Sequence, residues 1–282
     1  MLFCYNILQY VRRFKKAGKH AGLSPEEVQA ALEDMLKRTG FAGFDPESET
    51  FRSANAADSD NASKGNGVSN GFDHNAHVAL YREDGAIRHD SMLWGLIPGH
   101  ITNAEAAKEI AGKTLNARAE TIFEKPSFKY SVLNKRCLLP LNGFFEHHHK
   151  GGKTIPHYIT KKDAEFYFLA SIYDEWHDPH TGNLIKTFSI VTTEANEMMA
   201  KIHNAKKNDP RMPLVLSGDD LLVWLDPDST KEQLTELMQA APNDWLEAHT
   251  VKPLKGKNSA TDVDDAIKPF HYPDEVAQQS LF

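Results

Sequence analysis

Six short apolar runs, separated by turn residues rather than by regular helices, most constrain what this chain can fold into. They predict strands at residues 77–81, 136–145, 155–160, 165–172, 187–193 and 213–216. The clearest helical patterns between and after them lie at residues 103–111, 194–202, 219–225 and 230–240. Strands that do not alternate with helices favour an α+β fold with a largely antiparallel sheet flanked by helices over a doubly wound sheet.

Two polar segments lie outside this pattern. Residues 52–72 are rich in Ser, Asn, Asp and Gly, which predicts a mobile polar loop. From about residue 255 onward the sequence is again polar and predicts a surface tail. Before the loop, Ser24 and Pro25 open a helical pattern that Gly40 ends. At this length the chain, residues 1–282, can form one large domain or two small ones, with a core that needs no covalent cross-links.

The stretch GFFEHHH, at residues 143–149, combines one carboxylate with three histidines. In an extended chain, His147 and His149 point to one side and Glu146 to the other, so the histidines cannot all bind one ion. The spacing also differs from that of zinc helix motifs, so we expect no metal site. Glu146 borders an apolar run, and loss of hydration there would raise the pKa of its carboxyl group. The histidines read as a polar strand end before the turn at residues 150–152.

The overall charge and cysteine usage narrow the function classes. The formal net charge is -7, which argues against strong non-specific nucleic-acid binding but leaves room for a local basic groove. Two cysteines, Cys4 and Cys137, form no disulfide framework, which is typical of a reducing compartment. No apolar run is long enough to span a bilayer. We therefore expect a cytoplasmic protein.

Four places put reactive groups beside apolar strand or turn sequence. They are Cys4, the stretch 116–121 (NARAET), Glu146, and His203 with Arg211. A cysteine with a histidine suggests a thiol nucleophile and an acid-base partner, and an asparagine can orient a substrate. The alternatives are structural: a small buried thiol, a turn held by a salt bridge, and a cation at a helix C-terminus.

Several strings occur here in an order that resembles one family. They are WGLIP at 94–98, LNARAET at 115–121, RCLLPLNGFFE at 136–146, IH at 202–203 and RMPLVLS at 211–217. Together they resemble the SRAP family, the SOS response-associated peptidases, which are viewed as abasic-site processing proteins. The resemblance spans most of the chain. It implies a single domain with a barrel-like antiparallel sheet, and covalent crosslinking to abasic sites in single-stranded DNA, with DNA-bound protein associated with the nucleoid.

The resemblance also implies roles for individual residues. Cys4, once N-terminal, would form an imine through its amine and close a thiazolidine through its thiol. Asn116 would position the sugar, and Glu146 and His203 would transfer protons during imine formation and ring opening. Further residues would contact DNA: Arg118 and Arg211 at flanking phosphates, and Trp94 stacked on a base. The partner would be single-stranded DNA containing abasic sites, and no cofactor, membrane or required protein partner is expected.

Three features depart from the family pattern. Met1, Leu2 and Phe3 precede Cys4, whereas the family places its cysteine directly after the initiator methionine. An amide nitrogen cannot form an imine, so we expect removal of residues 1–3, for example by autoproteolysis. The segment NAKKNDP, at 204–210, separates His203 from Arg211, and His147 stands where the family commonly has tryptophan.

Two other functions remain open from the sequence. One is a cysteine-dependent peptidase that uses Cys4 or Cys137 with His203 on its own N-terminus or on other proteins. The other is a single-stranded DNA binder that lacks the reactive amine and does not crosslink.

Overall fold

The computed structural model describes residues 3–6, 69–164, 166–205, 208–256 and 258–272. Within these residues most of the secondary structure is strand. The strands are β1 Phe3–Asn6, β2 Ser69–Asn70, β3 Ala76–Glu83, β4 Ala86–Trp94, β5 Asn116–Arg118, β6 Arg136–Lys150, β7 Lys153–Lys161, β8 Tyr167–His177, β9 Leu184–Glu194, β10 Arg211–Pro213, β11 Val215–Leu216 and β12 Leu246–Thr250. The helices are α4 Ala104–Ala111, α5 Lys129–Asn134, α6 Glu197–Ile202, α7 Asp220–Leu225, α8 Lys231–Leu237 and α9 Val263–Ala266, with 3-10 turns η1 Gly71–Asp73 and η2 Ala119–Thr121.

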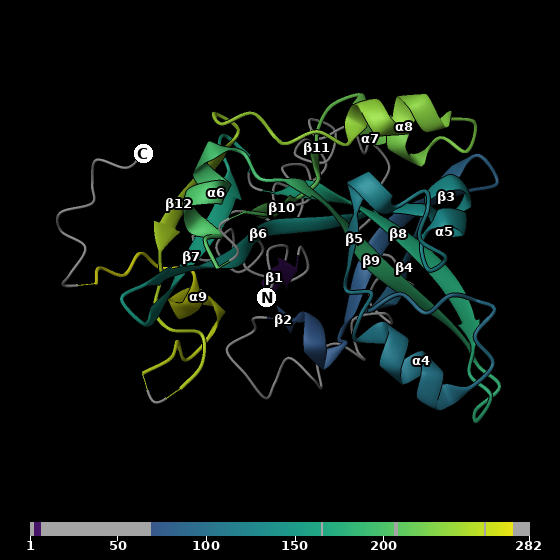
Figure 1. Ribbon diagram of the computed structural model, residues 1–282, viewed down its shortest axis with the longest axis horizontal. Coiled ribbons are helices and arrows are strands. Elements are labelled where there is room, and N and C mark those ends of the chain that lie inside the picture. The colour runs from purple at the N-terminus through teal and green to yellow at the C-terminus, as the bar shows by residue number, and fades with distance from the viewer. Residues whose placement is uncertain (1–2, 7–68, 165, 206–207, 257, 273–282) are drawn as a thin grey trace, which may run out of the picture.

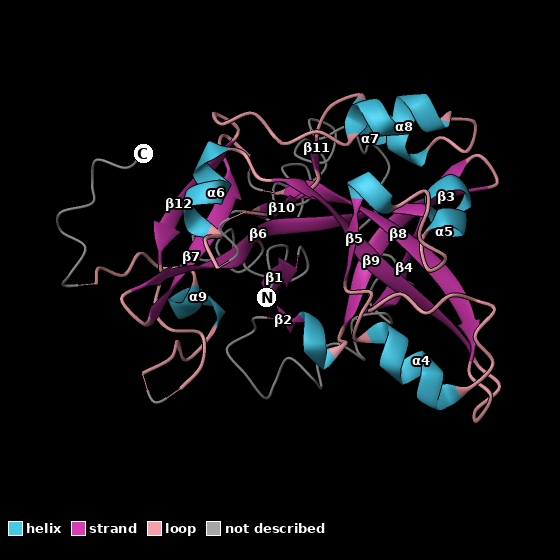
Figure 2. Ribbon diagram, viewed as in Figure 1, coloured by secondary structure: helices cyan, strands magenta, loops and turns pink. Residues whose placement is uncertain are grey.

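Five of these strands close into a barrel. β6 pairs with β3, β3 with β4, β4 with β9, β9 with β8, and β8 returns to β6. Only the β4–β9 contact in this ring is parallel, and it is short. The predicted α+β fold with a largely antiparallel, barrel-like sheet flanked by helices is therefore confirmed (Figure 2).

The two faces of the barrel wall hold different apolar clusters. On β6, Cys137 and Leu139 belong to one cluster and Leu138 to the other, as alternation along a strand requires. The Leu138 cluster includes Leu221 of α7 and Leu234 of α8, so it lies outside the barrel, under the helices. The other cluster draws side chains from all five ring strands and fills the interior: Ala79, Tyr81, Met92, Trp94, Cys137, Leu139, Leu169, Tyr173, Phe188 and Ile190.

Beyond the ring, the second half of β6 continues into a more open sheet, which we call the arm: residues 143–150 of β6 with β1, β2, β7 and β12 (Figure 1). Pro140 lies between the residues of β6 that pair with β3 and those that pair with β1, where its missing N–H leaves no gap in either ladder. Gly143 is tightly enclosed, because a Cβ there would lie 2.6 Å from the Ile159 carbonyl oxygen. The strand can therefore pass this point only with glycine.

The two polar segments expected from the sequence are partly described. Residues 69–72, the end of the expected loop, form β2 and the start of η1, while 52–68 and the expected helix after Ser24 lie outside the described residues. The described part of the tail carries α9, whose Ala266 is fully buried against the arm. Lys252 pairs with Asp265 at 2.8 Å, which ties the tail to the chain after β12. No helix among the described residues is long and apolar enough to cross a membrane.

Candidate active site

Three of the side chains singled out from the sequence, Arg118, Arg211 and His203, lie around the end of β9. β5 runs parallel to β9 on one side, with Arg118 opposite Thr192. β10 runs antiparallel on the other side, with Arg211 opposite Glu194. The two arginines thus come from strands that flank β9 on opposite sides and meet at Thr192, which both strands pair with.

Arg211 is held in a fixed position. Its guanidinium donates to both carboxylate oxygens of Glu120, at 2.6 and 2.7 Å, and to the carbonyl of Thr192 at 2.8 Å. Its side chain is only 13% exposed. Partial burial disfavours the Glu120 carboxylate, but the hydrogen bonds and charge of Arg211 outweigh this and lower its pKa. A bidentate pair of this kind fixes the guanidinium plane.

Arg118 is more accessible and is paired with Asp209 across an exposed contact. Half of the Arg118 side chain is exposed. Asp209 belongs to the segment 204–210, the departure noted in the sequence. Both candidate phosphate-binding arginines therefore carry a carboxylate partner in this structure, and in the case of Arg118 the segment itself supplies it.

His203 directly follows α6 and contacts Arg211 despite the intervening segment. Nδ1 of His203 lies 3.0 Å from both the backbone nitrogen and the carbonyl oxygen of Arg211, so it accepts from the N–H in one tautomer and donates to the carbonyl in the other. The ring is half-buried. His203 and Arg211 are therefore in contact although seven residues separate them in the sequence.

Glu146 lies on the second half of β6 and is only 7% exposed. One of its oxygens accepts the His147 N–H at 2.9 Å. The end of α6 is bonded to the same strand, since Nδ1 of His148 lies 2.8 Å from the Lys201 carbonyl and Asn204 exchanges two hydrogen bonds with the His149 backbone. These contacts bring His203 to the part of β6 that carries Glu146.

The three histidines after Glu146 end the strand as predicted, because β6 stops at Lys150 before a two-residue turn. No group of three or more metal-binding side chains occurs among the residues that the structure describes. Burial lowers the pKa of His147 to about 4. The same cause lowers the pKa of His157, the cross-strand neighbour of Glu146, to about 4. Both rings are therefore neutral near pH 7.

Cys4 is placed by the backbone pairing of β1. It lies opposite Phe144 of β6 and opposite Ser69 of β2. Cys4 therefore lies beside the strand that carries Glu146, and its partner Phe144 precedes Glu146 by two residues. Asn116 is exposed on β5 and, with Arg118, lines one side of a hollow of about 670 Å³.

Sequence reasoning missed His77 near this site. It is 4% exposed and lies 2.9 Å from the hydroxyl of Ser69, the cross-strand neighbour of Cys4. Its ring stands edge-on to Trp94 and Phe188, and burial lowers its pKa to about 4. The one sequence signal for His77 was the alternation along β3, which turns this residue toward the barrel interior.

Two sequence expectations need correction. Trp94 is 1% exposed, stacks on Phe188 and donates its indole N–H to the Leu115 carbonyl at 2.9 Å, so its face is not available to a base. It belongs to the barrel interior because β4 turns it inward. Cys137 is fully buried in the same interior, and burial raises the pKa of its thiol, so it does not suit a peptidase nucleophile.

Known proteins share this fold and part of this sequence. A protein from Bacteroides thetaiotaomicron, solved by X-ray crystallography, superposes with a TM-score of 0.62 at 37% identity, covering 66% of this chain and 78% of that one. The abasic site processing proteins YoqW and YoaM of Bacillus subtilis are each 32% identical, over 79% and 85% of this chain and 89% and 96% of their own lengths. The abasic site processing protein HMCES of Gallus gallus is 32% identical over 48% of this chain and 44% of its own length.

The family described as SOS response associated peptidase (SRAP) matches residues 29–257. The chain therefore belongs to the SRAP family, as its motifs indicated.

Proposed function

We propose that this protein processes abasic sites in single-stranded DNA by crosslinking to them through Cys4 after residues 1–3 have been removed. The observation that carries the proposal is the convergence on one end of β9 and one half of β6. Arg211 bonds to His203, the end of α6 bonds to β6 beside Glu146, and β1 lays Cys4 along the same strand. The relatives named as abasic site processing proteins supply the substrate class.

The reaction balances without an oxidant or a metal ion. The amine of Cys4 adds to the aldehyde of the ring-opened sugar, and loss of one water gives an imine. The thiol then adds to the imine carbon and closes a five-membered thiazolidine. Glu146 would accept and return the amine protons, and His203 would donate or accept the proton that opens the sugar. Asn116 would hold the sugar, and Arg118 and Arg211 its flanking phosphates.

An intact mass measurement tests this proposal. The purified protein is incubated with a single-stranded oligonucleotide that contains one abasic site, denatured and weighed. We expect an adduct equal to the protein without Met1–Phe3 plus the oligonucleotide minus one water. Cys4→Ser should give no adduct, while Cys137→Ser, which changes a buried thiol, should crosslink like the wild type.

Other outcomes identify the alternatives. Salt-sensitive binding with no adduct and with Met1 still present would mean a non-crosslinking DNA binder. Cleavage of added peptides by a protein that does not bind DNA would mean a cysteine-dependent peptidase. Either result contradicts the proposal.

A further inference from the structure

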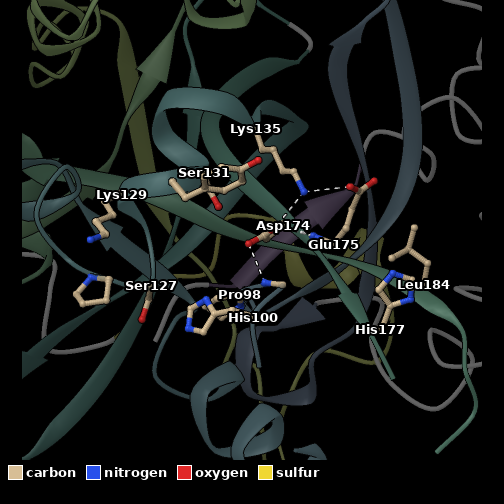
Figure 3. Close-up of a pocket in the computed structure, with 13 residues that line it drawn as sticks. Pro98, His100, Ser127, Lys129, Ser131, Lys135, Asp174, Glu175, His177 and Leu184 are labelled. Carbon is tan, nitrogen blue, oxygen red and sulfur yellow. Dashed lines mark hydrogen bonds and ion pairs between the residues drawn. The ribbon is translucent and has the colours of Figure 1, made fainter. Parts of the chain in front are cut away.

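Two hollows next to the candidate site share residues. The first, of about 670 Å³, begins at Asn116 and Arg118 and extends along α4. The second, of about 710 Å³, lies against α5 and β8 (Figure 3). Pro126 and Ser127 line both, so the hollows adjoin there. We call the two together the flank groove.

The first hollow is basic although the chain as a whole is acidic. Its charged lining residues are Lys113, Arg118 and Lys125 against one carboxylate, Glu109. Lys113 pairs with Glu109 at 2.5 Å and Arg118 with Asp209. Lys125 is exposed and, among the residues that the structure describes, has no ion-pair partner. This half of the groove therefore has a cation to offer an anionic ligand.

The floor of the second hollow holds one cation between two carboxylates, so it carries no free positive charge. The ammonium of Lys135 lies between Asp174 and Glu175, at 2.9 and 3.0 Å, as the dashed lines in Figure 3 mark. Burial alone would lower the pKa of Lys135, but these two carboxylates outweigh it and raise the pKa. Its charge is thus already satisfied. The floor would not attract an anion, and any further ligand has to be held by the rim.

The rim supplies a cation and an aromatic ring. Lys129 is exposed, and no described carboxylate pairs with it. Tyr130 is 56% exposed, an unusual state for a large aromatic side chain, and the Lys135 ammonium lies 5.7 Å from its ring centroid. A cationic groove with an exposed aromatic is the arrangement that binds single strands, whose bases stack on the ring while lysines follow the phosphates.

We propose that the flank groove seats the nucleotides on one side of the abasic site. Lys125 and Lys129 contact their phosphates, and Tyr130 stacks on a base. The inference rests on the proposed function, because Asn116 and Arg118 at the start of the groove belong to the site itself. The flank groove would hold the unmodified nucleotides in a defined position. The protein would then recognise the bases on one side of the lesion as well as the lesion itself.

Binding at several salt concentrations tests the path. For the variant Lys125→Ala/Lys129→Ala, the slope of log K against log salt should be smaller in magnitude by about 1.4, since each single-strand phosphate contact contributes about 0.7. Lys162→Ala is the matched control, because Lys162 is an exposed lysine directly after β7, bonded through its backbone to Trp245. It should keep the wild-type slope. A slope unchanged in the double variant, or lowered equally in the control, overturns the inference.

The position of the lesion in the oligonucleotide gives a second test. On an oligonucleotide that lacks nucleotides on the groove side of the lesion, the double variant should have the wild-type affinity. When those nucleotides are present, the double variant should bind more weakly than the wild type. Tyr130→Ala should lose about 5- to 150-fold in affinity on the longer oligonucleotide, and nothing when the flanking positions carry no bases. An equal loss of affinity by Tyr130→Ala whether or not the flanking positions carry bases overturns the stacking role. If the wild type binds no single-stranded DNA, the proposed function itself fails. If the wild type crosslinks and the variants behave like it, the proposed function stands and only the role of the flank groove is wrong.

Discussion

The closed barrel and the arm are made from one sheet but differ in the polar side chains that they bury. The barrel interior is almost entirely apolar, with Leu169, Phe188 and Ile190 completely buried. The arm carries Glu146 and His157, both nearly buried and both polar. A closed ring has no free edge and little room for polar groups, whereas an opening sheet leaves space for helix ends and loops to meet it. The difference teaches that most of the apolar core lies in the barrel, whereas the arm holds the buried carboxylate that the proposed chemistry would use.

Glu146→Gln should have the largest effect on activity and little on stability. The amide keeps the shape of the side chain but cannot transfer protons, so the crosslinking rate should fall by about 10²- to 10⁴-fold. Rates measured on a single-stranded abasic oligonucleotide check this, with the affinity for DNA measured alongside. Glu247→Gln, an exposed carboxylate on β12 of the same arm, should keep the wild-type rate. A comparable loss in both variants would break the assignment of chemistry to Glu146.

Phe188→Ala should have a large effect on stability and little effect on activity. The ring is fully buried in the barrel interior, and its removal should lower the free energy of unfolding by about 3–5 kcal/mol. Urea denaturation measures this change. Phe72→Ala, in an exposed ring, should cost far less. Crosslinking per folded molecule should remain near the wild-type value, and a selective loss of activity in Phe188→Ala would mean that the barrel takes part in the chemistry.

Lowering the pH should destabilise both regions through their buried histidines. The pKa of His77 in the barrel and of His157 in the arm is lowered to about 4 by burial. The unfolded chain takes up each proton near pH 6.5, so stability falls as the pH drops from about 6.5 to about 4. Each residue contributes up to about 1.4 kcal/mol per pH unit. Urea denaturation across this range should show a flatter slope for His77→Gln and for His157→Gln, and an unaltered slope for the exposed His180→Gln. Parallel curves for all three would refute the expectation.

Asp209→Asn should have the smallest effect, and it should be a gain. The carboxylate of Asp209 pairs with Arg118 where a phosphate would bind, so neutralising it should tighten single-stranded DNA binding by about two- to fivefold. Fluorescence anisotropy at low salt can resolve this change. Asp228→Asn, at an exposed position beyond α7, serves as the control for net charge. Equal tightening in both variants would show that only overall charge had changed.

Much of the fold could be predicted from local patterns. Each of the six predicted strand regions contains a strand, because apolar alternation reports burial of one or both faces. β4 was missed because Arg88, His89 and Asp90 interrupt its apolar pattern before it enters the barrel at Met92. β5 and α5 were missed because they are too short to show a period. The closure of the ring followed from the family resemblance, since it depends on pairing between distant strands.

The candidate site was predictable in its residue types but not in all its contacts. Motifs indicated Glu146 and His203, yet the return of Arg211 to His203 depends on the path of seven intervening residues. The Asp209 contact to Arg118 depends on that same path. Trp94 was misjudged because a tryptophan in a motif looks the same in the sequence whether its side chain faces a ligand or the core. Its direction depends on which way β4 faces in the barrel.

A single continuous strand joins the two regions. β6 runs for 15 residues from Arg136 in the barrel wall to Lys150 at the end of the arm, and Glu146 lies on it without an intervening loop. A carboxylate carried by such a strand acquires its position when the barrel folds. The conformational entropy of ordering it is therefore part of the free energy of folding and does not have to be supplied by binding a damaged strand.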